Sequence, residues 1–232
     1  MKTYLIVGGT SGIGLETTKL LSKNNRVIVI SREKKNIDGL SNVEFFSADI
    51  TKPAENLPEV DGEINGIVYC PGTINLKPIK SLKIEDFQND FEVNVLGAVK
   101  VINKYFANLK SAETSSIVLF STVAVQIGMQ YHASVASAKG AIEGLTRSLA
   151  AEFAPSIRVN CIAPSITNTP LAEKLLNNEA KLKASEDRHP LKRIGNSKEI
   201  SELVSFLLSE NSGFITGQII KADGGISSVK TL

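Results

Sequence analysis

Two hydrophobic periods alternate along this chain. Short apolar runs rich in β-branched residues recur at residues 4–7, 26–30, 43–46, 66–70, 116–120, 157–162 and 218–222. Between several of them, apolar residues follow helical spacing over residues 13–23, 86–109, 134–153, 170–183 and 197–209. This order predicts an α/β fold: a doubly wound parallel sheet of about seven strands, with right-handed crossovers and helices on both faces.

No linker, repeat or low-complexity tract interrupts the pattern, so residues 1–232 are expected to form a single domain. The chain is 42% hydrophobic and 22% charged, which is ordinary for a soluble globular protein. Its net charge is only +2 and its basic residues are scattered, which argues against binding nucleic acid or an anionic membrane. A small molecule is the expected ligand.

The two cysteines, Cys70 and Cys161, lie in apolar, strand-like runs. They are expected to be reduced and buried rather than to form a metal site, as in a reducing compartment. No apolar run reaches the roughly 20 residues of a membrane span, and the N-terminus lacks a signal-peptide core. A cytoplasmic protein is therefore expected.

A glycine-rich loop separates the first predicted strand from the first predicted helix. It contains Gly8, Thr10, Ser11, Gly12, Ile13 and Gly14. Glycine permits a tight turn and close backbone approach, and a helix N-terminus offers N–H groups and partial positive charge to a pyrophosphate. In this context the pattern indicates dinucleotide binding. The alternative is a glycine turn that only joins strand to helix.

Two further motifs lie downstream. Asn94-Val95-Leu96-Gly97 falls in a predicted helix, and Phe120-Ser121-Thr122 precedes a stretch that runs from Tyr131 to Lys139-Gly140. Together with the glycine loop, these motifs resemble the short-chain dehydrogenases/reductases, which are Rossmann-fold oxidoreductases. The resemblance covers the whole chain, including residues 190–195 and 216–225. The segment between Arg32 and Asp61 is brief, so one or two crossover helices of the family are expected to be shortened there.

The resemblance implies a catalytic centre that departs from the family at one position. In the family, a Ser, a Tyr and a Lys four residues after the Tyr perform hydride-coupled proton transfer, assisted by an Asn. Counting from Lys139, the Tyr position holds Val135 and the Ser position Thr122, and Asn94 matches the Asn. Valine neither donates nor accepts a proton, and the loss of a positioned acid costs about 10²–10⁴ in rate.

The remaining catalytic candidates have alternative interpretations. Lys139 can bind the nicotinamide ribose without taking part in proton transfer. Asn94 can bond the backbone inside its helix, and Thr122 can be a polar strand end. Two neighbours, Tyr131 and His132, are candidates for a substitute acid. If the helix begins early, the Tyr131 phenol lies one turn before Val135 on the same face, and the imidazole of His132 has an unperturbed pKa near neutral pH. They could instead shape the pocket wall or contact a neighbouring subunit.

Cofactor choice depends on the end of the second strand, where a carboxylate would bond the ribose hydroxyls of NAD. Here the residues are Ser31 and Arg32, which can hold a 2′-phosphate, so NADP(H) is favoured over NAD(H). The alternative is that Arg32, next to Glu33, is only solvated.

The resemblance places further dinucleotide contacts in loops after later strands. They are Asp49 and Ile50 near the adenine, Cys70, Pro71 and Gly72 near its ribose, and Pro164, Ser165, Thr167 and Thr169 around the nicotinamide. Tyr69-Cys70 replaces two amide residues of the family.

The leading hypothesis is an NADP(H)-dependent oxidoreductase that acts on a carbonyl or secondary alcohol with an altered proton donor. The alternative is a non-catalytic NADP(H)-binding sensor or partner subunit. The resemblance also implies a homo-oligomer, a tetramer or dimer, for which one helix supplies small and apolar candidates that could equally face the sheet. These are Ala141, Gly144, Leu145, Leu149 and Phe153.

Overall fold

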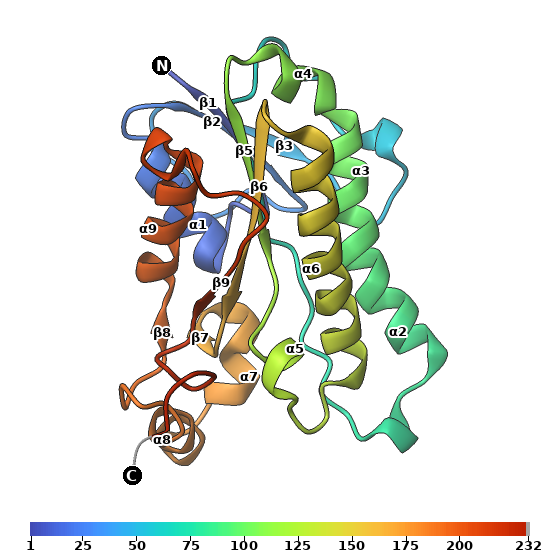
Figure 1. Cartoon of the computed structure of the whole chain (residues 1–232), viewed down its shortest axis with the longest axis vertical. Coiled ribbons are helices and arrows are strands. Elements are labelled where there is room, and N and C mark those ends of the chain that lie inside the picture. The colour runs from blue at the N-terminus through green and yellow to red at the C-terminus, as the bar shows by residue number, and fades with distance from the viewer. Residues whose placement is uncertain (231–232) are drawn as a thin grey trace.

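Seven strands form one parallel sheet between two layers of helices (Figure 1) in a computed structural model, which describes residues 1–230. The strand order is β3-β2-β1-β4-β5-β6-β9, and all neighbouring pairs are parallel. The strands are β1 (Thr3–Val7), β2 (Arg26–Ser31), β3 (Val43–Ser47), β4 (Gly66–Tyr69), β5 (Ser115–Phe120), β6 (Ile157–Pro164) and β9 (Ile219–Ala222). The predicted fold class is confirmed.

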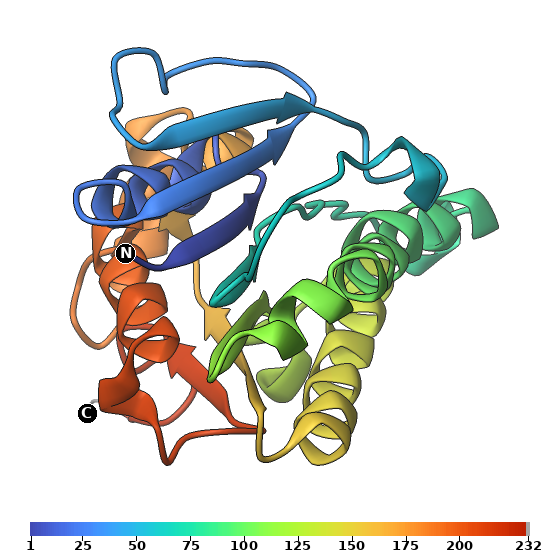
Figure 2. The ribbon, with the colours of Figure 1, turned by 90° about the horizontal axis from the view of Figure 1, so that it is seen from above.

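The helices divide between the two faces of the sheet, as the view from above shows (Figure 2). On one side, α1 (Gly12–Leu21) packs against α9 (Ser197–Leu208). On the other side lie α2 (Ile84–Phe91), α3 (Gly97–Lys104), α4 (Phe106–Ser111) and the long α6 (Ala133–Phe153). Three further helices are α5 (Ala124–Ile127), α7 (Glu173–Leu176) and α8 (Glu179–Asp187). A small second sheet pairs β7 (Thr167–Asn168) with β8 (Gly195–Asn196).

Burial of both sheet faces explains the continuous apolar runs of the strands. Along β1, Leu5 and Val7 join the core beneath α3, α4 and α6, whereas Tyr4 and Ile6 join the core beneath α1 and α9. Because successive side chains of a strand point to opposite faces, a sheet covered on both sides needs apolar residues at every position.

Two expected helices are interrupted. The segment expected to be helical over residues 86–109 contains a π-helical turn, η3 (Glu92–Leu96), and breaks at Tyr105 before α4. The segment expected over 170–183 is instead a 3₁₀ turn, η4 (Pro170–Ala172), followed by α7 and α8. Asn178 has an extended backbone and its side chain accepts a bond from Lys181 N, so it begins a new helix.

The brief segment after β2 is simplified, as the sequence indicates. Between β2 and β3 the chain forms a loop, and between β3 and β4 only a 3₁₀ turn, η1 (Ala54–Asn56). The side of the sheet near β3 is therefore built largely from loops.

The core on both faces of the sheet predicts that two leucines differ in their contribution to stability. Leu5 is fully buried and Leu191 is 62% exposed. Leu5→Ala is expected to lower the free energy of unfolding by about 2–5 kcal/mol, because it removes apolar contacts and leaves a cavity. Leu191→Ala should stay within about 0.5 kcal/mol. Urea unfolding measures both, and equal losses would contradict this account of the core.

Candidate active site

A cavity of about 590 Å³ opens where the strands end, beside the point at which the chain order reverses between β1 and β4. Such a crevice is the usual ligand site of an open α/β sheet. It collects most of the predicted dinucleotide contacts. These are Gly8, Thr10, Ser11, Gly12, Ile13, Gly14, Ser31, Arg32, Asp49, Ile50, Cys70, Pro71, Gly72 and Thr169.

The glycine loop can admit a pyrophosphate. Gly8 and Gly12 have φ angles of +79° and +52°, which favour glycine. A methyl group on Gly14 would lie 2.3 Å from the Gly8 carbonyl oxygen, so only glycine lets the first turn of α1 lie against the loop. Ser11 makes no side-chain cap, which leaves the N–H groups of that turn for an anion. The backbone present fits a dinucleotide.

Two residues that the sequence did not single out brace this loop. The Thr18 hydroxyl donates to the carbonyl oxygens of Gly9 and Gly14, at 3.0 and 2.9 Å. Asn36 Nδ2 donates to the Thr10 carbonyl oxygen at 3.2 Å, from the loop after β2. The contacts of Thr18 with Gly9 and of Asn36 with Thr10 have no local signature, because each joins segments that the fold brings together.

The end of the cavity next to β2 carries an unpaired cation. Arg32 is exposed and forms no ion pair within residues 1–230, while Glu33 pairs instead with Lys35 at 3.5 Å. On the other wall, Asp49 Oδ1 accepts from the Thr51 amide and hydroxyl at 2.9 and 2.8 Å. These bonds hold the pKa of Asp49 below its ordinary value, so its carboxylate stays ionised and Oδ2 remains an acceptor.

Polar side chains of the loop after β6 form hydrogen bonds mainly within the protein. Ser165 Oγ lies 2.8 Å from His189 Nε2, and His189 Nδ1 lies 2.6 Å from the Ser185 carbonyl oxygen. Because a carbonyl only accepts, Nδ1 donates there and the Ser165 hydroxyl donates to Nε2. Thr167 donates back to the Ser165 carbonyl oxygen. Of Pro164, Ser165, Thr167 and Thr169, only Thr169 lines the cavity.

Lys139 and Asn94 meet behind Gly72. A methyl group on Gly72 would lie 3.2 Å from Asn94 Oδ1 and 3.4 Å from Lys139 Nζ. The Lys139 ammonium donates to the Phe120 carbonyl oxygen at 2.8 Å, and burial lowers its pKa to about 8. Asn94 Nδ2 donates to the Asp90 carbonyl oxygen, the intrahelical contact considered as its alternative, and to the Thr73 hydroxyl.

Tyr69 holds the segment that carries Asn94. Its hydroxyl donates to the Val93 carbonyl oxygen at 2.6 Å, inside the π-helical turn. A methyl group on Gly97 would lie 2.2 Å from the Tyr69 hydroxyl oxygen, so glycine there makes room for the phenol. Tyr69 therefore fixes a helix instead of supplying the amide that the family has at this position.

Val135 lies near the start of α6, and Thr122 lies two residues after β5. Val135 is 5% exposed, so its side chain is buried. The Thr122 hydroxyl accepts from the Ala124 amide at 3.3 Å and keeps its own proton for donation. Neighbouring Ser121 is buried and donates to Glu143 Oε1 at 2.8 Å.

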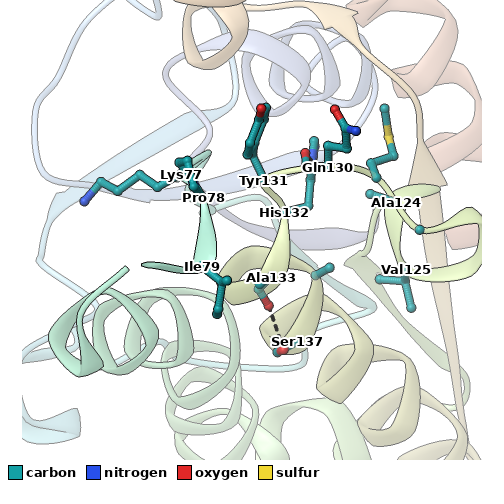
Figure 3. Close-up of a pocket in the computed structure, with 13 residues that line it drawn as sticks. Lys77, Pro78, Ile79, Ala124, Val125, Gln130, Tyr131, His132, Ala133 and Ser137 are labelled. Carbon is teal, nitrogen blue, oxygen red and sulfur yellow. Dashed lines mark hydrogen bonds between the residues drawn. The ribbon is translucent and has the colours of Figure 1, made fainter. Parts of the chain in front are cut away.

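Tyr131 and His132 lie in a different cavity, of about 740 Å³, between the segment of Lys77 and the N-terminus of α6 (Figure 3). Tyr131 is 55% exposed, and its carbonyl oxygen accepts from the Lys77 amide. The His132 ring bonds the Gln130 carbonyl oxygen at 2.7 Å. Neither lines the dinucleotide cavity, so the structure does not bring them together with Gly72.

Within residues 1–230, no cluster of three or more His, Cys, Asp or Glu side chains is placed to hold a metal ion. The helices of the same residues include none long and apolar enough to cross a membrane.

Comparisons with known proteins agree with this architecture. Residues 7–227 match a family model described as enoyl-(acyl carrier protein) reductase. A tropinone reductase homologue of Arabidopsis thaliana is 32% identical over 97% of this chain and 92% of its own length. The 3-oxoacyl-[acyl-carrier-protein] reductase of Thermotoga maritima is 30% identical over 97% of both chains.

Solved structures are equally similar. A short chain dehydrogenase family protein from Francisella tularensis superposes with a TM-score of 0.90 at 32% identity, covering 99% of this chain and 100% of its own. ElxO, solved with NADP bound, has a TM-score of 0.89 at 26% identity and covers 98% and 99%.

The close approach at Gly14 predicts a sharp effect of one methyl group. Gly14→Ala is expected to weaken NADPH binding at least about tenfold, because the added carbon collides with the loop backbone. Gly140→Ala is the matched control, since its methyl would meet only Val125 at 3.7 Å. Fluorescence titration with NADPH measures both variants, and unchanged affinity for Gly14→Ala would refute the assignment of this loop.

Proposed function

Since the chain belongs to the short-chain dehydrogenase/reductase family, we propose that it is an NADP(H)-dependent oxidoreductase that interconverts a carbonyl and a secondary alcohol with an altered proton donor. One observation carries the proposal: Gly72 lines the cavity that fits the dinucleotide, and the buried Lys139 and Asn94 lie directly behind it. A binding cavity that leads to groups able to move a proton is what such a reaction needs.

The preference for NADP(H) rests on the adenosine end. Arg32 and Lys35 line the cavity there, next to the hydroxyl of Ser31, which accepts from Thr10 Oγ1 at 3.2 Å. A guanidinium with no intramolecular partner can bind a 2′-phosphate through two parallel hydrogen bonds. The NADP bound to the similar structure of ElxO is consistent with this preference.

The reaction divides between the cofactor and the protein. When bound, the dinucleotide supplies or accepts the hydride. The Lys139 ammonium has N–H groups for the nicotinamide ribose, and the Thr122 hydroxyl can donate to a substrate oxygen. The proton must come from a residue other than Val135, and the positions of Tyr131 and His132 beside a separate cavity give them less support than their spacing suggests.

A non-catalytic dinucleotide-binding protein is the second candidate, because Val135 cannot act as an acid. The relatives include a 3-oxoacyl-[acyl-carrier-protein] reductase and a glucose 1-dehydrogenase of Gluconobacter oxydans, which favours an enzyme. The substrate is a small molecule that would enter between Gly72 and the segment of η4, α7 and α8.

A homo-oligomer is also proposed. Of the candidates on α6, Ala141, Leu145, Leu149 and Phe153 pack partly against the chain's own core. The exposed apolar side chains Ile84, Phe91 and Leu96, on α2 and η3, are available for contact with a second copy.

Turnover tests the proposal directly. Purified protein is expected to oxidise NADPH, followed by its absorbance, with at least one member of a panel of ketones, aldehydes and quinones. Val135→Tyr should raise kcat on an unactivated ketone by about 10² or more, because it returns an acid to the expected position. Tight NADPH binding without oxidation on any substrate, in either protein, would reject the oxidoreductase in favour of the non-catalytic candidate.

Removal of one cation tests the cofactor preference. Arg32→Ala is expected to raise the Kd for NADPH about 10–100-fold and to leave the Kd for NADH nearly unchanged, since only the 2′-phosphate loses its hydrogen bonds. Lys34→Ala is the control, because Lys34 pairs with Asp38 and does not line the cavity. A parallel loss for both nucleotides would show that Arg32 does not read the phosphate.

A further inference from the structure

Buried polar atoms without a partner lie on the helices that pack around Lys139. Within residues 1–230, the buried side-chain atoms without a hydrogen-bond partner are Asp90 Oδ2, Asn94 Oδ1, Ser115 Oγ and Ser134 Oγ. Three of the four belong to α2, η3 and α6, which pack against one another. Because buried polar atoms are almost always hydrogen-bonded, by water if not by protein, this cluster indicates water held between the three elements.

Asp90 is the unusual member of the cluster. Its carboxylate is fully buried and has no ion-pair partner within 4.0 Å among the described residues. Oδ1 accepts from the Thr73 hydroxyl at 2.6 Å, and Thr73 in turn accepts from Asn94 Nδ2 at 2.9 Å. A buried carboxylate with one oxygen unsatisfied is costly, so its presence needs a compensating charge nearby.

The cation nearest in the fold to this cluster is the Lys139 ammonium, since a methyl group on Gly72 would lie 3.4 Å from Lys139 Nζ and 3.2 Å from Asn94 Oδ1. Of its three N–H groups, one donates to the Phe120 carbonyl oxygen. Burial lowers the pKa of Lys139 to about 8, and Cys161 on β6, Cys70 at the end of β4 and Asp90 on α2 act against this lowering. Burial also raises the pKa of both thiols to about 12, so neither is ionised near neutral pH.

Asp90 is therefore the charged neighbour that favours the ammonium. Glu143 lies one turn further along α6, and its carboxylate accepts a hydrogen bond from the Ser121 hydroxyl. The nearby residue of η3, Asn94, carries no charge.

We propose that Lys139 donates the proton in place of the phenol missing at Val135, through a water bound to Asn94 Oδ1, and that Asp90 is the positioning residue that keeps its amine protonated. The inference rests on the oxidoreductase proposed above. Lys139 is the catalytic residue here, and Asp90 acts only through it.

In the reducing direction, an N–H bond of Lys139 breaks and its proton passes to the bound water. The water gives a proton to the substrate carbonyl oxygen, where an O–H bond forms. The substrate carbonyl carbon accepts the hydride of the reduced dinucleotide, and the dinucleotide is released in its oxidised form. The neutral amine then regains a proton from solvent through the water at Asn94 Oδ1. An ammonium with a pKa near the working pH suits this exchange, because proton transfer is most efficient there.

A pH titration of the cofactor-free protein tests the coupling of Asp90 to Lys139 without an activity measurement. The full chain is labelled with ¹³C at the lysine ε carbons, and the Lys139 resonance is identified by its loss in Lys139→Met. Its midpoint is expected near pH 8 in the wild type and about one unit lower in Asp90→Asn, where the counter-charge is gone. Glu85→Gln removes a charge from the exposed surface of the same helix and should leave the midpoint unchanged.

A wild-type midpoint near the ordinary value of about 10.4 would overturn the proposal even if Asp90→Asn failed to fold. An unshifted midpoint in folded Asp90→Asn would overturn the role of Asp90.

Kinetics then separate this inference from the function on which it rests. At saturating NADPH, kcat should fall as the pH rises through the Lys139 midpoint, and the fall should move to lower pH in Asp90→Asn but not in Glu85→Gln. Lys139→Met should lose at least about 10²-fold in kcat. Turnover by the wild type with an unchanged rate in Lys139→Met would overturn the inference alone. Absence of turnover in the wild type would overturn the oxidoreductase, whereas the lysine titration still judges the coupling of Asp90 to Lys139.

Discussion

Parallel pairing of seven strands is the constraint on which the rest of the molecule depends. Because every strand runs the same way, each return path must cross a face of the sheet, and both faces become buried. All the carboxyl ends then meet at one edge, where chain segments far apart in sequence converge. Gly8, Arg32, Asp49 and Gly72 follow four different strands, yet they line one cavity.

Sequence patterns predicted the parts of this arrangement that have local signatures. Alternating hydrophobic periods indicated the strands and helices, and the spacing of Gly8, Gly12 and Gly14 indicated the loop that lines the cavity. Thr18 and Asn36 could not be recognised, since hydroxyls and amides contact backbone at many places and only the fold shows where. The break before α8 was missed for a related reason, because Asn178 is a cap only when its neighbours adopt the matching conformation.

The catalytic region illustrates the same limit more strongly. Asn94 and Lys139 were recognisable by resemblance, but Tyr69 and Asp90 were not, although both sit among the groups that position Asn94. A phenol at the end of a strand and an acid inside a helix are unremarkable in sequence. The contacts of Tyr69 and Asp90 depend on a π-helical turn and on the packing of α2 against α6, and hydrophobic periodicity predicts neither.

The missing helix between β2 and β3 has a consequence for how such a protein can change over evolutionary time. The cavity walls around Arg32 and Asp49 are loops joined to the glycine turn by contacts such as Asn36 to Thr10, whereas Lys139 and Asn94 are set in packed helices. Substitutions in those loops can change one end of the cavity without disturbing the helices that hold Lys139 and Asn94. The two ends of one cavity can therefore diverge independently.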